Sequence, residues 1–157
     1  MKKINISDLL FFVIVTELAG VLSSLLSGGN FGDHYSTLTK PPLAPPGWLF
    51  PVVWGLLYAV MGFSAYLINK SDNLGKRTAL IIYFVQLAVN VLWSPVFFGL
   101  KSFGGAIAVI VVLDALVIAM LVLFGKINRC AALVNIPYLV WVLFATYLTI
   151  GFTVLNK

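Results

Sequence analysis

The stretch Lys40-Pro-Pro-Leu-Ala-Pro-Pro-Gly-Trp48, followed at once by Leu49-Phe-Pro-Val-Val-Trp54, separates two long apolar parts of the chain. Its four prolines lie within residues 41–46, where they fix φ and favour an extended, polyproline-like course. Glycines at 28, 29 and 32 precede them, so the connector 27–47 is expected to have a flexible first half and a stiff second half. A connector of about twenty residues in a compact protein is usually functional or disordered. A lid over a ligand pocket and a simple spacer are both consistent with this pattern.

The rest of the chain is apolar enough to lie in a membrane. Of its 157 residues, 61% are hydrophobic and 10% are charged, and the mean hydropathy is +1.05. A membrane-spanning helix needs about 20 apolar residues, and five segments qualify: Leu9 to Leu26, Trp48 to Ile68, Thr78 to Phe98, Phe103 to Phe124 and Ala131 to Leu155. The sequence predicts an all-α integral membrane bundle of five transmembrane helices, with residues 1–157 forming a single domain. A membrane β-barrel is not indicated, because the segments lack the period-two alternation of barrel strands.

The net charge of +5 indicates orientation rather than a nucleic-acid partner, because the basic residues form no patch with interleaved aromatic side chains. Basic residues favour the cytoplasmic side of a membrane. If the N-terminus lies there, that side holds Lys2, Lys3, Lys70, Lys76, Arg77, Lys126 and Arg129, whereas the other side holds Lys40, Lys101 and Lys157. We therefore expect a protein of the cell membrane with a cytoplasmic N-terminus and an outer C-terminus.

The sequence contains no recognisable catalytic or metal-binding motif. Cys130 is the single cysteine, so a disulfide within the chain and a cysteine metal cluster are excluded. His34 is the single histidine and is expected to be a solvated loop residue, with axial ligation of a haem iron as the alternative. Nucleotide-binding loops, nucleophile elbows and zinc-protease helices are not found. We expect no catalytic residues, no required cofactor and no enzymatic activity.

The third predicted helix has a mixed polar and aromatic face. Gln86, Asn90, Trp93 and Phe97 follow at spacings of four, three and four, which places them on one side of a helix. An apolar surface with a few amide groups is typical of a ligand pocket, and hydrogen bonding between helices is the alternative. Pro95 removes one backbone hydrogen bond beside this face and predicts a local kink.

The second and fifth predicted helices carry similar aromatic faces. Helix two offers Pro51, Trp54, Tyr58 and Met61, and helix five offers Pro137, Trp141, Ala145 and Leu148 with Tyr138 and Phe144 at its flanks. We expect the indoles of Trp54, Trp93 and Trp141 to converge on one interior, although simple aromatic packing gives the same pattern.

Two acidic residues and several small residues lie inside the predicted spans. Glu17 and Asp114 are functional candidates, possible members of a proton path, but a protonated carboxyl hydrogen-bonded to a neighbour is the simpler expectation. Small residues recur four apart at Gly20, Ser24 and Gly28 and at Gly55 and Ala59, and they are interpreted as seams of helix contact.

Three stretches resemble the TspO/MBR family of tryptophan-rich sensory and translocator proteins: residues 34–62, 86–99 and 137–146. The resemblance implies a five-helix bundle, often a homodimer, that binds porphyrins such as protoporphyrin IX or haem in a pocket closed by the first loop. With the helix faces above, the expected ligand contacts are Trp54, Tyr58, Gln86, Asn90, Trp93, Phe97, Trp141, Phe144 and Ala145. The expected lid residues are Pro41, Leu43, Pro45, Pro46 and Trp48. The resemblance therefore implies that the protein is a receptor or carrier with a sensory or transport role.

The chain departs from the family pattern at two positions of the lid. Leu43 stands where many members have tryptophan. His34 and Tyr35 stand where many members have the pair Trp-Tyr, so His34 also replaces a tryptophan. A lid indole is linked in the family to light-dependent porphyrin breakdown, so weak or absent breakdown is expected here. A porphyrin-degrading enzyme and a structural interaction protein are the alternative functions. The proposed cholesterol pattern fails, because Lys157 is the first basic residue after Tyr147.

Overall fold

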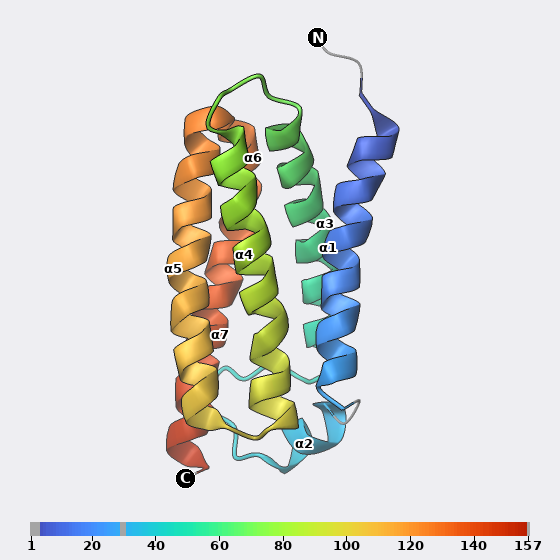
Figure 1. Cartoon of the computed structure of the whole chain (residues 1–157). Coiled ribbons are helices and arrows are strands. Elements are labelled where there is room, and N and C mark those ends of the chain that lie inside the picture. The colour runs from blue at the N-terminus through green and yellow to red at the C-terminus, as the bar shows by residue number, and fades with distance from the viewer. Residues whose placement is uncertain (1–3, 29–30, 157) are drawn as a thin grey trace.

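Five long helices lie side by side in the computed structural model, which describes residues 4–28 and 31–156 (Figure 1). They are α1 (Ile6–Leu26), α3 (Leu49–Asn69), α4 (Lys76–Ser94), α5 (Phe103–Ile127) and α7 (Ile136–Leu155). Three short elements complete the order: α2 (Phe31–Thr37), the π-helical turn η1 (Pro95–Gly99) and α6 (Arg129–Leu133). The two ends of the chain lie at opposite ends of the bundle (Figure 1).

The predicted membrane architecture is confirmed. Among the described residues, five helical segments are long and apolar enough to cross a membrane: Ile6–Leu26, Leu49–Asn69, Lys76–Gly99, Phe103–Ile127 and Arg129–Leu155. The described chain is helical with no strand. The protein is therefore an all-α integral membrane protein.

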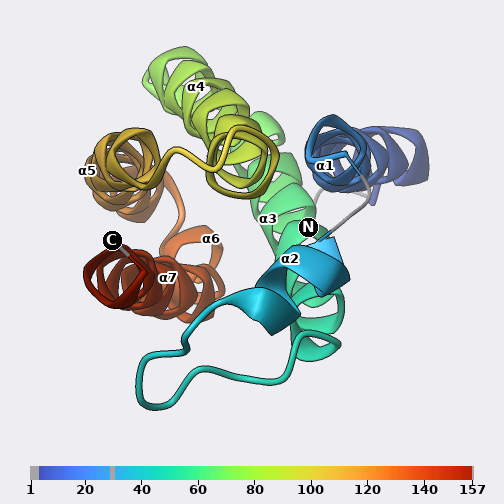
Figure 2. The same ribbon diagram turned by 90° about the horizontal axis from the view of Figure 1, so that it is seen from below.

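The helices pack mainly as neighbours around a ring. α1 packs along α3 and α4, α4 packs along α5, and α5 packs along α7. Contact between α3 and α7 is slight, and the connector that contains α2 runs across the lower ends of these two helices (Figure 2). The bundle is thus least tightly closed between α3 and α7, at the end that the connector covers.

The sequence predicts a local kink at Pro95, and at this residue the α-helix changes to the π-helical turn η1. Proline has no N–H to donate to the carbonyl of Val91 four residues earlier. That carbonyl instead accepts a hydrogen bond of 3.0 Å from the Ser23 hydroxyl of α1. Close by, the hydroxyls of Ser27 and Ser94 are 2.8 Å apart. Two serines of α1 therefore tie it to α4 at the point where α4 loses its regular bonding.

The fifth predicted helix is not continuous, contrary to expectation. It divides into α6 and α7 at Val134 and Asn135, because Pro137 in the first turn of α7 has no N–H for the carbonyl of Leu133. The buried Asn135 amide supports the break, since it donates to the Ser64 hydroxyl of α3 and to the Ala131 carbonyl at 2.9 Å.

The connector also differs from expectation in both halves. Residues 31–37 form α2 rather than a flexible glycine segment, because the Tyr35 ring is buried edge-on against Phe50 and Phe152. The proline half is not one extended strut: Ala44 donates to the Pro41 carbonyl at 3.2 Å, closing a turn. Leu43 adopts a φ of +65° in this turn.

Gly62 permits a close approach of the α3 backbone to the α1 backbone. A Cβ at this position would lie 2.6 Å from the Cα of Val13 and 2.8 Å from the carbonyl oxygen of Phe12, both backbone atoms of α1. We expect Gly62→Ala to force the helices apart and to lower the free energy of unfolding by about 1–3 kcal/mol. Thermal unfolding of the purified protein in detergent measures this loss.

The matched control is Gly55→Ala on the same helix, where nothing lies within 4 Å of an added Cβ. Alanine should be neutral or stabilising there, because it favours the helix over glycine. Equal destabilisation by both substitutions would contradict the role given to Gly62.

Candidate ligand-binding site

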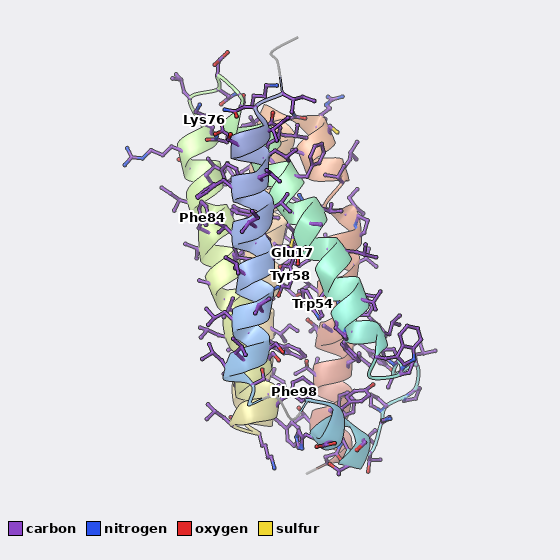
Figure 3. The ribbon with its side chains drawn as sticks, turned by 90° about the vertical axis from the view of Figure 1, so that its right-hand side faces the viewer. Glu17, Trp54, Tyr58, Lys76, Phe84 and Phe98 are labelled. Carbon is purple, nitrogen blue, oxygen red and sulfur yellow. The ribbon has the colours of Figure 1, made fainter. Side chains whose placement is uncertain are left out.

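A cavity of about 380 Å³ lies between α1, α3 and α4, where α1 and α3 diverge below their contact at Gly62. Figure 3 shows Glu17, Tyr58 and Trp54 in the space between these two helices. The lining residues are Glu17, Gly20, Val21, Ser23, Ser24, Ser27, Phe50, Pro51, Trp54, Gly55, Tyr58, Asn90, Trp93, Ser94 and Phe98. The volume falls in the range of small-molecule pockets, about 300–1,000 Å³.

Aromatic rings form two walls of the cavity. On α3, Trp54 stacks on Tyr58 with centroids 5.4 Å apart. On α4 and η1, Trp93 stacks on Phe97 at 5.4 Å and meets Phe98 edge-on at 5.9 Å. Paired rings hold the indoles in place, so the cavity presents flat apolar surfaces that are already ordered.

A buried hydrogen-bond network lies behind these walls and joins three helices. The Tyr58 hydroxyl donates to Asn90 Oδ1 at 2.6 Å, and Asn90 Nδ2 donates to the Tyr138 hydroxyl at 2.9 Å. Tyr138 in turn donates to Gln86 Oε1 at 2.7 Å. The network fixes the Asn90 amide at the cavity wall and links α3, α4 and α7.

The structure brings together only some of the residues expected at the site. Trp54, Tyr58, Asn90 and Trp93 line the cavity. Gln86 and Phe97 are fully buried behind its wall, whereas Trp141, Phe144 and Ala145 of α7 do not line it. Trp141 instead packs against Phe50 with centroids 6.0 Å apart. Two of the three indoles therefore share this cavity, and Phe50 stands between it and the third.

Sequence reasoning missed the contribution of α1. Gly20, Ser23 and Ser24 of α1 and Ser27 at its C-cap line the cavity, whereas the sequence pattern interprets Gly20 and Ser24 only as parts of a contact seam. Gly20 is a true contact, because a Cβ there would clash with the Tyr58 ring. The seam interpretation is wrong for Gly55, which faces the cavity with nothing within 4 Å of its Cβ position.

The proline half of the connector is attached to α7. The Tyr147 hydroxyl donates to the Pro42 carbonyl at 2.8 Å, and the Asn156 side chain exchanges hydrogen bonds of 2.8 and 2.9 Å with the Thr39 backbone. The ring of Pro41 rests on Gly151, where a Cβ would lie 2.6 Å from the Cβ of the proline. The connector is therefore held in one position across the end of the bundle.

The expected lid residues take different positions in this segment. Pro41 is buried and Pro45 is half-buried, and the Pro45 carbonyl accepts a bond of 2.5 Å from the Tyr35 hydroxyl. Burial raises the pKa of Tyr35, so its hydroxyl stays protonated and keeps this bond at neutral pH. Pro46 is exposed, and Leu43 and Trp48 are 81% and 68% exposed, so these side chains do not face the cavity.

The two acidic residues of the spans have different surroundings. Asp114 of α5 accepts a hydrogen bond of 2.8 Å from Thr146 of α7, which confirms the expected bond to a neighbour. Glu17 lines the cavity, and within the described part of the chain its carboxyl group has no hydrogen-bond partner. No three histidine, cysteine, aspartate or glutamate side chains come together among the described residues in a way that could hold a metal ion.

His34 is not the solvated loop residue that was expected. It lies on α2 with its ring edge-on to Phe98 at 6.1 Å, and its Nε2 is buried. Burial, and secondly the positive charge of Lys101, lower the pKa of His34, so the imidazole is neutral at pH 7.

The chain matches the model of the TspO/MBR family over residues 12–155. It belongs to the TspO/MBR family. The protein CrtK of Rhodobacter capsulatus is 36% identical to this TspO/MBR protein over 147 residues, which cover 92% of this chain and 90% of the relative. The tryptophan-rich sensory protein of Cereibacter sphaeroides is 39% identical over 114 residues, covering 73% and 71%. The translocator protein of Bos taurus is 32% identical over 137 residues, covering 85% and 81%.

The hydrogen-bond network of this TspO/MBR protein predicts an order of stability losses. Tyr138→Phe leaves Gln86 Oε1 and Asn90 Nδ2 unpaired, whereas Tyr58→Phe leaves only Asn90 Oδ1 unpaired. We expect Tyr138→Phe to cost about 1–3 kcal/mol and Tyr58→Phe about half as much. Thermal unfolding in detergent gives both values, and Tyr147→Phe at the surface serves as a control for losing one hydroxyl. A larger loss for Tyr58→Phe than for Tyr138→Phe would contradict the network.

Proposed function

We propose that this TspO/MBR protein is a membrane receptor or carrier that binds a porphyrin, or a similar flat apolar molecule, in the cavity between α1, α3 and α4. The observation that carries the proposal is the pair of ordered indoles, Trp54 and Trp93, lining one cavity of about 380 Å³. Flat rings of the protein provide stacking surfaces for a flat ligand. The printed names of the relatives, sensory protein and translocator protein, agree with a receptor or carrier role.

Polar groups at the wall provide the anchors for such a ligand. The Nε1 atom of Trp93 is buried, and it has no hydrogen-bond partner in the described parts of the chain. An unpaired buried donor costs free energy that a ligand acceptor would recover. The Asn90 amide, already oriented by Tyr58 and Tyr138, offers a second polar contact. An apolar cavity with a few oriented polar groups is the usual composition of a small-molecule site.

The proposal also includes the membrane in which the protein lies and its orientation there. We propose that it acts in the cell membrane with the N-terminus in the cytoplasm, because seven basic residues flank the spans on that side and three on the other. The connector then faces outward. We propose a homodimer, as the family implies. The ligand and the lipid bilayer are the proposed partners. Neither a nucleic acid nor a cofactor is required.

A titration with protoporphyrin IX tests the binding function. Quenching of tryptophan fluorescence gives the affinity, and we expect Trp93→Leu to weaken binding about tenfold, because it removes one ring face and one N–H donor. Trp48→Leu is the matched control, since that indole is 68% exposed and lies outside the cavity. Absence of saturable quenching would overturn the proposal and would favour a protein-docking role without a ligand.

Porphyrin breakdown is the alternative function, and the lid argues against it. Leu43 has no oxidisable ring, and its side chain is exposed and turned away from the cavity. We therefore expect light-driven loss of protoporphyrin absorbance to proceed no faster with the protein than with Leu43→Ala or in detergent alone. Faster bleaching by the unmodified protein would establish a catalytic role.

A further inference from the structure

A second cavity of about 790 Å³ lies at the end of the bundle that the connector covers. Its lining residues come from the end of α1, from α2 and from the end of α4 with η1: Leu26, Ser27, Gly28, Asp33, His34, Thr37, Leu92, Pro95, Phe98, Gly99, Leu100 and Lys101. Ser27 and Phe98 line the first cavity as well. The two cavities are therefore neighbours separated by these shared walls, and Figure 3 shows Phe98 just above α2.

A row of rings leads from the first cavity to the second. The Trp93 ring meets Phe98 edge-on at 5.9 Å, and Phe98 meets the His34 imidazole edge-on at 6.1 Å. His34 thus lies two ring contacts away from an indole of the first cavity. A ligand whose body stacks against Trp93 has the second cavity directly beyond Phe98.

Two side chains that line the second cavity have a nitrogen atom without a partner. The Lys101 ammonium has no hydrogen bond or ion pair within residues 4–28 and 31–156, and the buried Nε2 of His34 has no partner there either. Lys101 supplies the permanent positive charge, because the imidazole of His34 is neutral at pH 7. A neutral imidazole still donates one hydrogen bond. An ammonium beside an N–H donor is a suitable pair for a carboxylate.

The charges of the two cavities differ in a way that orients an acidic ligand. Glu17 is the one acidic or basic residue among the described residues that line the first cavity, so a carboxylate there has no positively charged partner. The second cavity contains Lys101, together with Asp33 on α2 as an opposing charge. An acid group of a bound ligand is therefore more stable near Lys101 than near Glu17.

We propose that the ligand carries a carboxylate, that its apolar body occupies the first cavity, and that Lys101 and His34 bind the carboxylate in the second. This inference rests on the proposed function, and it adds the chemical class of the ligand and its orientation. His34 stands at a position where the lid pattern of the family differs, so the carboxylate contact is a property of this chain's own residues.

Protoporphyrin IX and its dimethyl ester test the proposal, because they share one macrocycle and differ in the charge of the acid groups. We expect the unmodified protein to bind the free acid about three- to tenfold more tightly than the ester, as for a partly solvated charged contact. Lys101→Gln should remove most of this preference while leaving the affinity for the ester unchanged. His34→Phe should reduce it partly, since phenylalanine keeps the ring contact with Phe98 and lacks the donor.

Two charge controls separate a local contact from net charge. Asp33→Asn should increase the preference for the free acid, because it removes the opposing charge from the same cavity. Lys126→Gln removes one positive charge at the opposite end of the bundle and should leave the preference unchanged. The preference should also fall as salt is raised, because the second cavity is open to solvent ions.

The outcomes distinguish this inference from the binding function itself. Equal affinity of the unmodified protein for acid and ester would overturn the carboxylate site while leaving porphyrin binding in place. Equal weakening of both porphyrins by Lys101→Gln would assign the lysine a structural role and would also overturn it. Failure of both porphyrins to bind would instead overturn the proposed function.

Discussion

The hydrogen bond from Ser23 to the Val91 carbonyl is the interaction on which the site depends most directly. Pro95 leaves that carbonyl without its helical partner, and inside a membrane no water is present to replace it. α1 must therefore contact α4 at this level, and Ser27 and Ser94 add a second link one turn away. α1 is held by α4 at its lower end and contacts α3 at Gly62 above, and Figure 3 shows α1 and α3 separating towards the end of the bundle where α2 lies. The cavity occupies the space that this divergence leaves.

The same requirement explains why the polar residues of the interior are connected to one another. Three helices contribute Tyr58, Asn90, Tyr138 and Gln86, and each of these side chains forms a hydrogen bond with the next. Such a network costs little in the apolar interior only when its members are paired. The Nε1 atom of Trp93, a residue that lines the cavity, stands outside this network without a partner among the described residues.

Sequence reasoning succeeded for properties that belong to a single segment. The five spans follow from length and hydropathy, and the irregular helix at Pro95 follows from a missing N–H. It failed for α2, because the helix depends on burial of Tyr35 against Phe50 and Phe152, which are distant in sequence. The division of the last helix at Asn135 was missed although Pro137 is a local signal for it, and the bond from the Asn135 side-chain N–H to Ser64 of α3 joins residues distant in sequence.

The chain itself determined that this is a five-span membrane protein of the TspO/MBR family and that Asn90 and Trp93 share one helical face. These conclusions need only the thickness of the hydrocarbon layer, the period of a helix and motifs that are local in sequence. Only the tertiary structure decided that α1 lines the cavity, that Trp141 lies behind Phe50, and that His34 and Lys101 line a neighbouring space. An empty volume has walls from several helices, so its place depends on how they tilt and rotate against one another, and no single segment contains that information.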